Sequence, residues 1–232
     1  MVTLTQSVGK ASTIELLKSS TYFAGLDNCA LERISRLMME RKVMKKEIIW
    51  LEQEPAKMIY FVASGLIKLF KTSTGGKEQI LRLVRPGDCF GHVGIFNGGS
   101  NPESAQALVP SVLYGLMKSD LEALLREYEQ LALNTIKILA TETHHYMSLV
   151  EDLSLRRVSG RLAKMLLEHS SEEIDDASLI LTQANMAAMT GTVREVIGKS
   201  VKALEEKGAI RSNRRSIIIK DINALRIMAG LV

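Results

Sequence analysis

The chain has 232 residues, a formal net charge of +4, 46% hydrophobic residues and 24% charged residues. Such a composition is typical of a soluble globular protein with one large domain or two modest ones. No apolar run reaches the length of a membrane span, and Met1–Lys10 lacks the basic-then-apolar shape of a signal peptide. Cys29 and Cys89 are too few and too far apart for a zinc finger or a disulfide framework, so we expect a cytoplasmic protein that engages no membrane.

The first half of the chain predicts short helices followed by strands. STIELLKSS and DNCALERISRLMM carry apolar residues at helical spacing, and Asp27 is a candidate N-cap. From Val43 to Met117, short runs rich in Ile, Val, Leu and Tyr alternate with turn residues such as Thr74–Gly76 and Arg85–Asp88. This pattern favours a small antiparallel β sandwich or barrel of the jelly-roll kind, and we take residues 1–118 as one domain.

A long helix is predicted next, over residues 119–153. Leucine, isoleucine, methionine and valine keep one side of it apolar from Leu121 to Leu153. A helix of roughly 30 residues outruns the core of its own domain. We therefore expect it to pack against the same helix of a second copy, with a hinge at Asp152–Ser154.

Residues 154–232 predict a separate α+β domain with a local basic excess. The pattern is a helix, an acidic loop, a short strand SLIL at Ser178–Leu181, two helices, a hairpin and a last short helix. From Leu155 onward there are 13 Lys and Arg against 9 Asp and Glu, which leaves 17 against 17 before it. A basic patch confined to one domain indicates a polyanionic partner, although a solvated helix face would give the same charge pattern.

The two helices TQANMAAM and VREVIGKSVKALEEKG, joined by TGT, form a predicted helix-turn-helix. Thr182 stands at an N-cap position, and Gly191 lies where the chain must turn with positive φ. Ala187 is small where two crossing helices approach each other. The apolar residues that would form the shared core are Met186, Met189, Ile197, Val201 and Leu204.

The second of these helices, residues 193–207, presents a charged side that suits base reading. Arg194 can donate two hydrogen bonds to guanine, and Glu195 can accept one from cytosine. Phosphates would repel a carboxylate that reads no base, so Glu195 favours sequence-specific binding. The alternative is a surface helix with i,i+4 charge pairs. The candidate DNA-binding residues are Thr182, Gln183, Thr192, Val193, Arg194, Glu195, Lys199 and Lys202, with Arg214 and Arg215 on a following hairpin wing.

These motifs resemble the Crp/Fnr superfamily of bacterial transcription regulators, from about Leu16 to the end. The stretch YFVASGLIKLFKTSTGGKEQILRLVRPGDCFGHVGIF is similar to the family's barrel, RVSGRLAKMLL to the helix after its dimer helix, and LTQANMAAMTGTVREVIGKSVKALEEKGAI to its helix-turn-helix. The resemblance implies a homodimer that binds double-stranded DNA at an inverted repeat of TGTGA-like half-sites and works with RNA polymerase. Lys199 stands where the family has arginine, which weakens bidentate reading of the outer guanine.

The resemblance also locates a candidate effector site in the barrel domain. Members that bind cyclic AMP carry Gly-Glu-Leu after the PGD turn and an Arg-Ser pair further on. Here His92 replaces the glutamate and Glu103 replaces the arginine, so a carboxylate would face the cyclic phosphate and repel it. We therefore expect an effector other than cyclic AMP. The candidate effector-binding residues are Gly91, His92, Val93, Glu103, Ser104, Tyr146 and Met147.

Several alternatives for the signal and the protein class stay open at this point. An iron–sulfur cluster of the Fnr kind needs four cysteines and is not expected, whereas haem could draw a ligand from His92, His144 or His145. Cys89 could sense redox state. Alternatively, an unidentified small organic or anionic molecule could bind, or the protein could act without any ligand. A cupin-like metal enzyme would need a His-x-His pair that the sequence lacks, so we expect no enzyme. A third class of protein, after regulator and enzyme, is a binding module whose long helix docks a protein partner in place of DNA.

Overall fold

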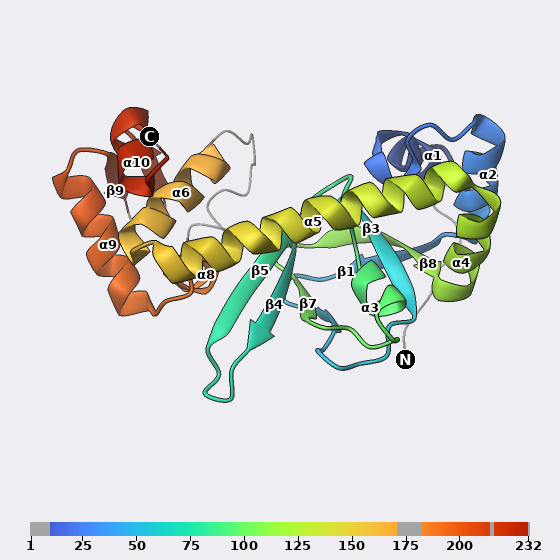
Figure 1. Ribbon diagram of the computed structural model, residues 1–232, viewed down its shortest axis with the longest axis horizontal. Helices are drawn as coiled ribbons and strands as arrows, with labels where there is room; N and C mark the ends of the chain where they lie inside the picture. The colour runs from blue at the N-terminus through green and yellow to red at the C-terminus, as the bar shows by residue number, and fades with distance from the viewer. Residues whose placement is uncertain (1–9, 171–181, 214–215, 232) are drawn as a thin grey trace. The chain divides into compact units, whose positions relative to one another are not determined.

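The computed structural model describes residues 10–170, 182–213 and 216–231 of the chain (Figure 1). The chain divides into two compact units, Met1–Lys71 with Arg82–His144 and Thr72–Leu81 with His145–Val232. Among the described residues, no helix is both long enough and apolar enough to cross a membrane.

Short helices open the first unit: α1 (Lys10–Ser19), η1 (Thr21–Phe23) and α2 (Asn28–Leu37). The Asp27 carboxylate accepts a hydrogen bond from the amide of Ala30 at 2.8 Å, which caps the N-terminus of α2. Ala30, Leu31 and Ile34 are buried on one face of this helix. The N-cap and the buried face that the sequence predicted for α2 are both confirmed.

Two four-stranded sheets follow, and their recorded pairings are antiparallel. One sheet has the order β1 (Met39–Val43), β8 (Ser111–Met117), β3 (Met58–Ser64) and β6 (Cys89–Phe90). The other has the order β2 (Ile48–Trp50), β7 (Ser104–Ala107), β4 (Ile67–Thr72) and β5 (Glu78–Val84). The short helix α3 (His92–Phe96) lies between β6 and β7 in the chain. The α+β class and the antiparallel β domain predicted from the sequence are confirmed.

Turn residues join these strands where the sequence placed them. The Ser73 amide donates to the Lys77 carbonyl at 2.9 Å and closes the β4–β5 hairpin. The Asp88 amide donates to the Arg85 carbonyl at 3.0 Å, and Gly87 adopts a φ of +91° in this turn. A left-handed φ strains any residue with a side chain, which explains a glycine at this point.

Aromatic side chains fill two cores of the first unit. In one core, the Phe61 ring lies 5.2 Å from Tyr22 and 4.8 Å from Phe23, centroid to centroid. In the other, the Trp50 and Phe90 rings are 5.0 Å apart. Edge-to-face and tilted aromatic contacts at these separations add to the free energy gained from burial. The first core ties the N-terminal helices to the strands.

The predicted single helix from Ser119 onward is two helices, α4 (Lys118–Glu127) and α5 (Glu129–Leu155). Tyr128 interrupts them with φ −114° and ψ 98°, an extended conformation. Its side chain packs against the first core of the unit. Tertiary packing of one aromatic residue therefore overrides a helical sequence pattern. The residues expected to act as a hinge, Asp152–Ser154, lie inside the last turn of α5.

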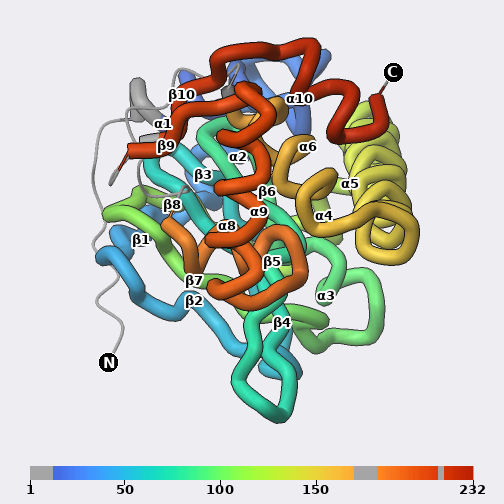
Figure 2. Tube along the Cα trace, turned by 90° about the vertical axis from the view of Figure 1, so that its left-hand side faces the viewer, coloured from blue at the N-terminus to red at the C-terminus, as the bar shows by residue number. Residues whose placement is uncertain are grey.

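The second unit contains α6 (Val158–Ser170), α8 (Gln183–Thr190), α9 (Arg194–Glu206), the strands β9 (Ile210–Asn213) and β10 (Ser216–Ile219), and α10 (Ile222–Ala229). Helices α6, α8 and α9 pack against one another, and α6 also contacts α10 (Figure 2). Met186, Ala187, Ile197 and Leu204 are buried in their common core, with Met189 and Val201 packed against it. The helix-turn-helix core predicted from the sequence is confirmed. The predicted strand at Ser178–Leu181 lies outside the described residues.

Candidate nucleic-acid interface and sensor site

The turn between α8 and α9 is built from local sequence signals. The Thr182 hydroxyl accepts a hydrogen bond from the Asn185 amide at 3.2 Å and caps α8. Gly191 ends α8 with φ +67°, and the Thr192 amide donates to the Ala187 carbonyl at 2.9 Å. The left-handed glycine lets the chain reverse within three residues and start α9 after Val193.

Helix α9 has a buried side and a charged, exposed side. Ile197 and Leu204 have no exposed surface, whereas Arg194, Glu195 and Lys199 are exposed. None of these three charged side chains has a hydrogen-bond or ion-pair partner among residues 10–170, 182–213 and 216–231. Buried apolar positions on the opposite side hold the helix in place. The first two turns of α9 thus present two cations and one carboxylate that are free to meet an external partner.

The other predicted DNA-binding residues lie around this turn. Thr182 and Gln183 are exposed at the start of α8, Thr192 is half-buried, and the Val193 side chain is 47% exposed. Lys202 is exposed one turn further along α9 and forms an i,i+4 ion pair with Glu206 at 3.8 Å. The described residues do not include Arg214 and Arg215 of the expected wing.

Glu205 positions the start of the wing, and no sequence pattern indicated this role. Its Oε1 accepts a hydrogen bond from the Ser212 amide at 2.5 Å. This bond connects the end of α9 to β9 and fixes where the hairpin leaves the recognition helix. An i,i+7 pairing between a helix and a following strand has no periodic signal in the sequence.

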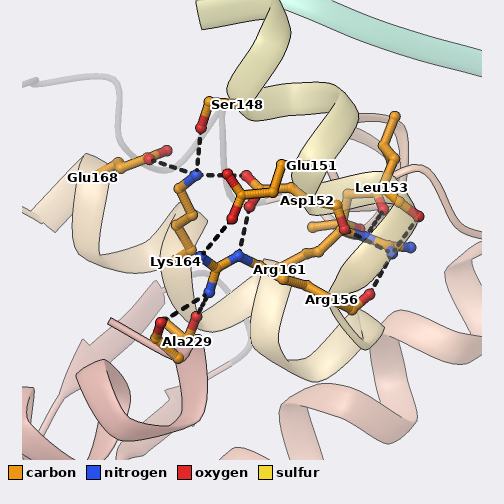
Figure 3. Close-up of polar contacts among 11 residues, drawn as sticks. Ser148, Glu151, Asp152, Leu153, Arg156, Arg161, Lys164, Glu168 and Ala229 are labelled. Atoms are coloured by element: carbon orange, nitrogen blue, oxygen red, sulfur yellow. Dashed lines mark hydrogen bonds and ion pairs between the residues drawn. The ribbon is translucent and has the colours of Figure 1, made fainter. Parts of the chain in front are cut away.

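Arg161 on α6 fixes the corner between α5 and α6 (Figure 3). Its Nη1 donates to the Arg156 carbonyl at 2.8 Å, with longer contacts to the carbonyls of Asp152 and Leu153. Its Nε donates to the Thr190 carbonyl at the end of α8, at 2.7 Å. One guanidinium therefore satisfies carbonyls at the C-terminal ends of two helices, where they lack intrahelical partners.

A second set of charges joins the same helices (Figure 3). The Asp152 carboxylate pairs with Arg156 Nε at 2.7 Å and with Lys164 Nζ at 2.6 Å. Lys164 also donates to the Ser148 hydroxyl at 2.9 Å, and Arg156 donates to the carbonyls of Ala229 and Gly230. The last turns of α5, the middle of α6 and the end of α10 are thus linked through two cations.

In the first unit, a buried charge cluster surrounds the predicted effector residue His92. The His92 Nε2 lies 2.7 Å from Glu142 Oε2, and the Cys89 Sγ lies 3.8 Å from His92 Nδ1. Arg82 of β5 forms an ion pair with the other oxygen of Glu142. The side chains of His92 and Glu142 are 2% and 8% exposed. The cluster joins β5, β6 and α3 to α5 at the position where we expected an effector.

Burial determines the protonation states in this cluster. It lowers the pKa of His92 to about 4, and the charge of Arg82 acts in the same direction. Burial also raises the pKa of the Cys89 thiol to about 12. At neutral pH a neutral His92 therefore donates from Nε2 to Glu142, and its Nδ1 is free to accept from the thiol. Both ring nitrogens are engaged, so a metal-ligand role for His92 would require the Glu142 contact to break.

The remaining effector candidates are distributed over two units. Gly91 has φ +95°, and a Cβ there would lie 2.9 Å from the Met58 carbonyl oxygen. Val93 is half-buried, and Ser104 is buried with its hydroxyl accepting from the Glu52 amide at 2.9 Å. Glu103 is buried as well. Tyr146 and Met147 belong to the second unit, where Tyr146 is half-buried and Met147 is 67% exposed.

Glu103 is a buried carboxyl in the barrel domain. Burial raises its pKa above the usual range. Its backbone carbonyl accepts a hydrogen bond from Trp50 Nε1 at 2.9 Å, which fixes the segment before β7. Within the described part of the chain, no group of three or more His, Cys, Asp or Glu side chains could hold a metal ion.

Sequence comparison assigns both halves of the chain to known domain families. Residues 40–128 match the cyclic nucleotide-binding domain, and residues 160–228 match the Crp-like helix-turn-helix domain. The first match covers the strands, α3 and α4, and the second covers α6 to α10.

Relatives extend over almost the whole chain. The Cyclic AMP receptor protein of Thermus thermophilus is 27% identical over 213 residues, which are 92% of this chain and 98% of the relative. A CRP-like cAMP-activated global transcriptional regulator of Mycobacterium tuberculosis is 24% identical over 217 residues, 91% of this chain and 97% of its own. A solved CRP-family transcriptional regulator from Thermus thermophilus has 26% identity and a TM-score of 0.67, covering 82% of this chain and 96% of its own.

Proposed function

Because the chain belongs to the Crp/Fnr superfamily of transcription regulators, which are not enzymes, we propose that it is a signal-responsive homodimer that reads an inverted-repeat DNA site through α9. The observation that carries the proposal is the exposed side of the first two turns of α9. There Arg194, Glu195 and Lys199 are exposed and have no partner among the described residues. They follow the turn after α8, whose N-terminus is capped by Thr182. Side chains at the start of a recognition helix reach the major groove.

We assign base reading to three residues of α9 and phosphate contacts to the residues around them. Arg194 donates to O6 and N7 of a guanine, Glu195 accepts from the N4 amino group of a cytosine, and Lys199 meets the outer guanine or a phosphate. The half-site is TGTGA-like, with the outer guanine read less strictly because lysine lacks the planar fork of arginine. The phosphate contacts are Thr182, Gln183, Thr192 and Lys202, with Arg214 and Arg215 of the wing, and the exposed Val193 makes an apolar contact with the DNA.

The test is fluorescence anisotropy with a labelled duplex that carries the inverted repeat, against the same duplex with scrambled half-sites. Arg194→Ala should cost about 1–3 kcal/mol on the specific duplex and relax the preference at one guanine. Arg226→Ala removes an equally exposed arginine from α10 and should leave both affinities unchanged. Equal losses on the two duplexes would mean that Arg194 contacts phosphate and reads no base.

An exposed apolar seam on α5 supports the homodimer. Its positions alternate at spacings of three and four residues, which is the a/d pattern of paired helices. Leu133 is 45% exposed, Ile136 62%, Met147 67% and Val150 63%. The positions that complete the seam are also exposed: Ala140, Thr143 and Ser154. Four large apolar side chains in water on one helix favour burial against a second copy.

We propose an effector other than cyclic AMP, although two relatives are named for that ligand. Glu103 is a buried carboxyl where members that bind cyclic AMP have arginine, and it would repel a cyclic phosphate. The haem alternative has weaker support, because both nitrogens of His92 have partners and His145 Nε2 lies 2.9 Å from the Leu81 carbonyl. RNA polymerase is the proposed protein partner of the DNA-bound homodimer.

A further inference from the structure

A cavity of about 420 Å³, lined by both apolar and polar groups, lies in the first unit beside the charge cluster. The lining comes from η1, from the turn Gly87–Cys89 and from α5 between Asn134 and Glu142. Neither Gly91–Val93 nor the pair Glu103–Ser104 lines it. Its volume lies in the range of small-molecule sites. The cavity therefore adjoins the predicted effector residue His92 through Glu142, but other residues line it.

The lining offers hydrogen-bond donors that no protein group uses. The Nε of Arg82 is buried and has no acceptor. The ammonium of Lys137 and the hydroxyl of Thr21 have no partner in the described ranges 10–170, 182–213 and 216–231. An ammonium and a hydroxyl without partners, together with a guanidinium in the lining, fit a ligand that accepts hydrogen bonds.

Two carboxylates line the cavity and repel a negatively charged ligand. Solvent exposure of one and an ion pair of the other reduce this repulsion. Asp88 is exposed at the rim, where it accepts from the Arg85 amide at 3.1 Å. Glu142 is buried, and it neutralises Arg82 through an ion pair while His92 holds its other oxygen. The Glu142 carboxylate thus already balances the charge of Arg82. A ligand anion has to compete with Glu142 for the same guanidinium.

We propose that this cavity is the effector site and that it takes a small organic oxyanion, a carboxylate or a phosphate ester, held by Lys137 and Arg82. The inference rests on the proposed function, since it names the ligand class of the same regulator. Arg82 belongs to β5 and Glu142 to α5, so a ligand that draws Arg82 away loosens a contact between the sheet and the long helix. Effector binding is thereby linked to the helix that carries the proposed dimer seam.

The experiment is isothermal titration of the full chain, without DNA, with sodium phosphate and with sodium acetate at constant ionic strength. The two anions separate phosphate recognition from carboxylate recognition. Lys137→Gln should weaken binding of the preferred anion by about threefold to tenfold, the range of one exposed charge contact. Lys45→Gln removes an equally exposed lysine from a turn of the same unit and should change nothing.

Glu142→Gln gives the sharper result because it removes the competitor and keeps the shape. This variant should bind the preferred anion at least about fivefold more tightly than the wild type. Equal or weaker binding by Glu142→Gln would overturn the proposal, as would equal affinities of Lys137→Gln and Lys45→Gln. If Glu142→Gln does not fold, the two lysine variants decide.

The two proposals fail separately. An anion held at the DNA-binding face would respond to Arg194→Ala and not to Lys137→Gln, and that result would overturn the cavity assignment. A protein that binds the anion as expected but shows no preference for the inverted repeat would refute the proposed DNA site and leave the cavity assignment intact.

Discussion

His92 shows how one buried residue determines the chemistry of the barrel domain. Its ring is almost inaccessible to water and lies between a thiol and a carboxylate that is itself paired with Arg82. A protonated ring would place a second cation beside the guanidinium in a poorly solvated site. The neutral ring is therefore part of the folded state, and protonation opposes folding.

This protonation predicts an acid-sensitive stability. The pKa of His92 is lowered to about 4 in the folded chain, against 6.5 in an unfolded chain. Between these values the unfolded state binds more protons, so the free energy of unfolding falls as the pH falls through this window. The loss should reach on the order of 3 kcal/mol below pH 4, and none of it should remain above pH 7.

Urea unfolding of His92→Gln and of the wild type, at pH 7 and at pH 4.5, measures this contribution. The variant should lose less stability on acidification, because glutamine keeps a donor for Glu142 and has no proton to bind. His144→Gln removes an exposed histidine and should behave as the wild type does. Burial raises the pKa of Glu103, so that group stabilises at low pH; it is common to all three proteins and cancels. Parallel pH profiles of wild type and His92→Gln would refute the assignment.

At the level of elements, the corner between α5 and α6 connects the end of α5 to the helix-turn-helix. Arg161 supplies hydrogen bonds to carbonyls at the ends of α5 and α8 at once. Hydrogen bonds from a charged donor contribute about 1.5–3 kcal/mol each, and a guanidinium fits several carbonyls because its donors are fixed in one plane. The last turns of α5 and the helix-turn-helix should therefore move together.

Replacing Arg161 tests this corner. Arg161→Met keeps much of the side-chain volume and removes all donors, so it should lower the unfolding free energy by about 2–4 kcal/mol. Hydrogen exchange should rise in the last turn of α5 and at the end of α8. The residues on the exposed face of α9 are the same as in the wild type. Arg157→Met changes a neighbouring exposed arginine on the same corner and should have little effect. Similar exchange in the two variants would contradict the role of Arg161.

Elements with local signals could be predicted from the sequence, and long-range pairs could not. Asp27, Thr182 and Gly191 act within four residues of their own position, so spacing and residue type were sufficient. The break at Tyr128 depends on packing against a core assembled from distant segments. Glu142 follows Leu131 and Ile138 at helical spacing on the buried side of α5, but nothing in that periodicity pairs it with His92, 50 residues away. The exposed side of α9 was predictable because it is the complement of an apolar face.

At the scale of the whole molecule, the basic excess and the apolar seam lie on different elements. The basic excess lies after Leu155, with the helix-turn-helix, and the exposed apolar seam lies on α5. A single recognition helix contacts too few bases for tight specific binding, and a twofold pair reads both halves of an inverted repeat. The seam and the basic domain can thus both contribute to reading an inverted repeat only if two copies associate.

Charges placed on the seam should separate the copies. Ile136→Glu and Val150→Glu each put a carboxylate where an apolar side chain would be buried, at a cost of several kcal/mol per interface because the twofold axis brings both copies together. Sedimentation should show twice 25.7 kDa for the wild type and a shift toward the single mass for the variants. Thr141→Glu adds the same charge at an exposed position on another side of α5 and should remain dimeric. Binding to the inverted repeat should fall with the dimer fraction, so a monomeric variant with full affinity would show that one copy reads the site alone.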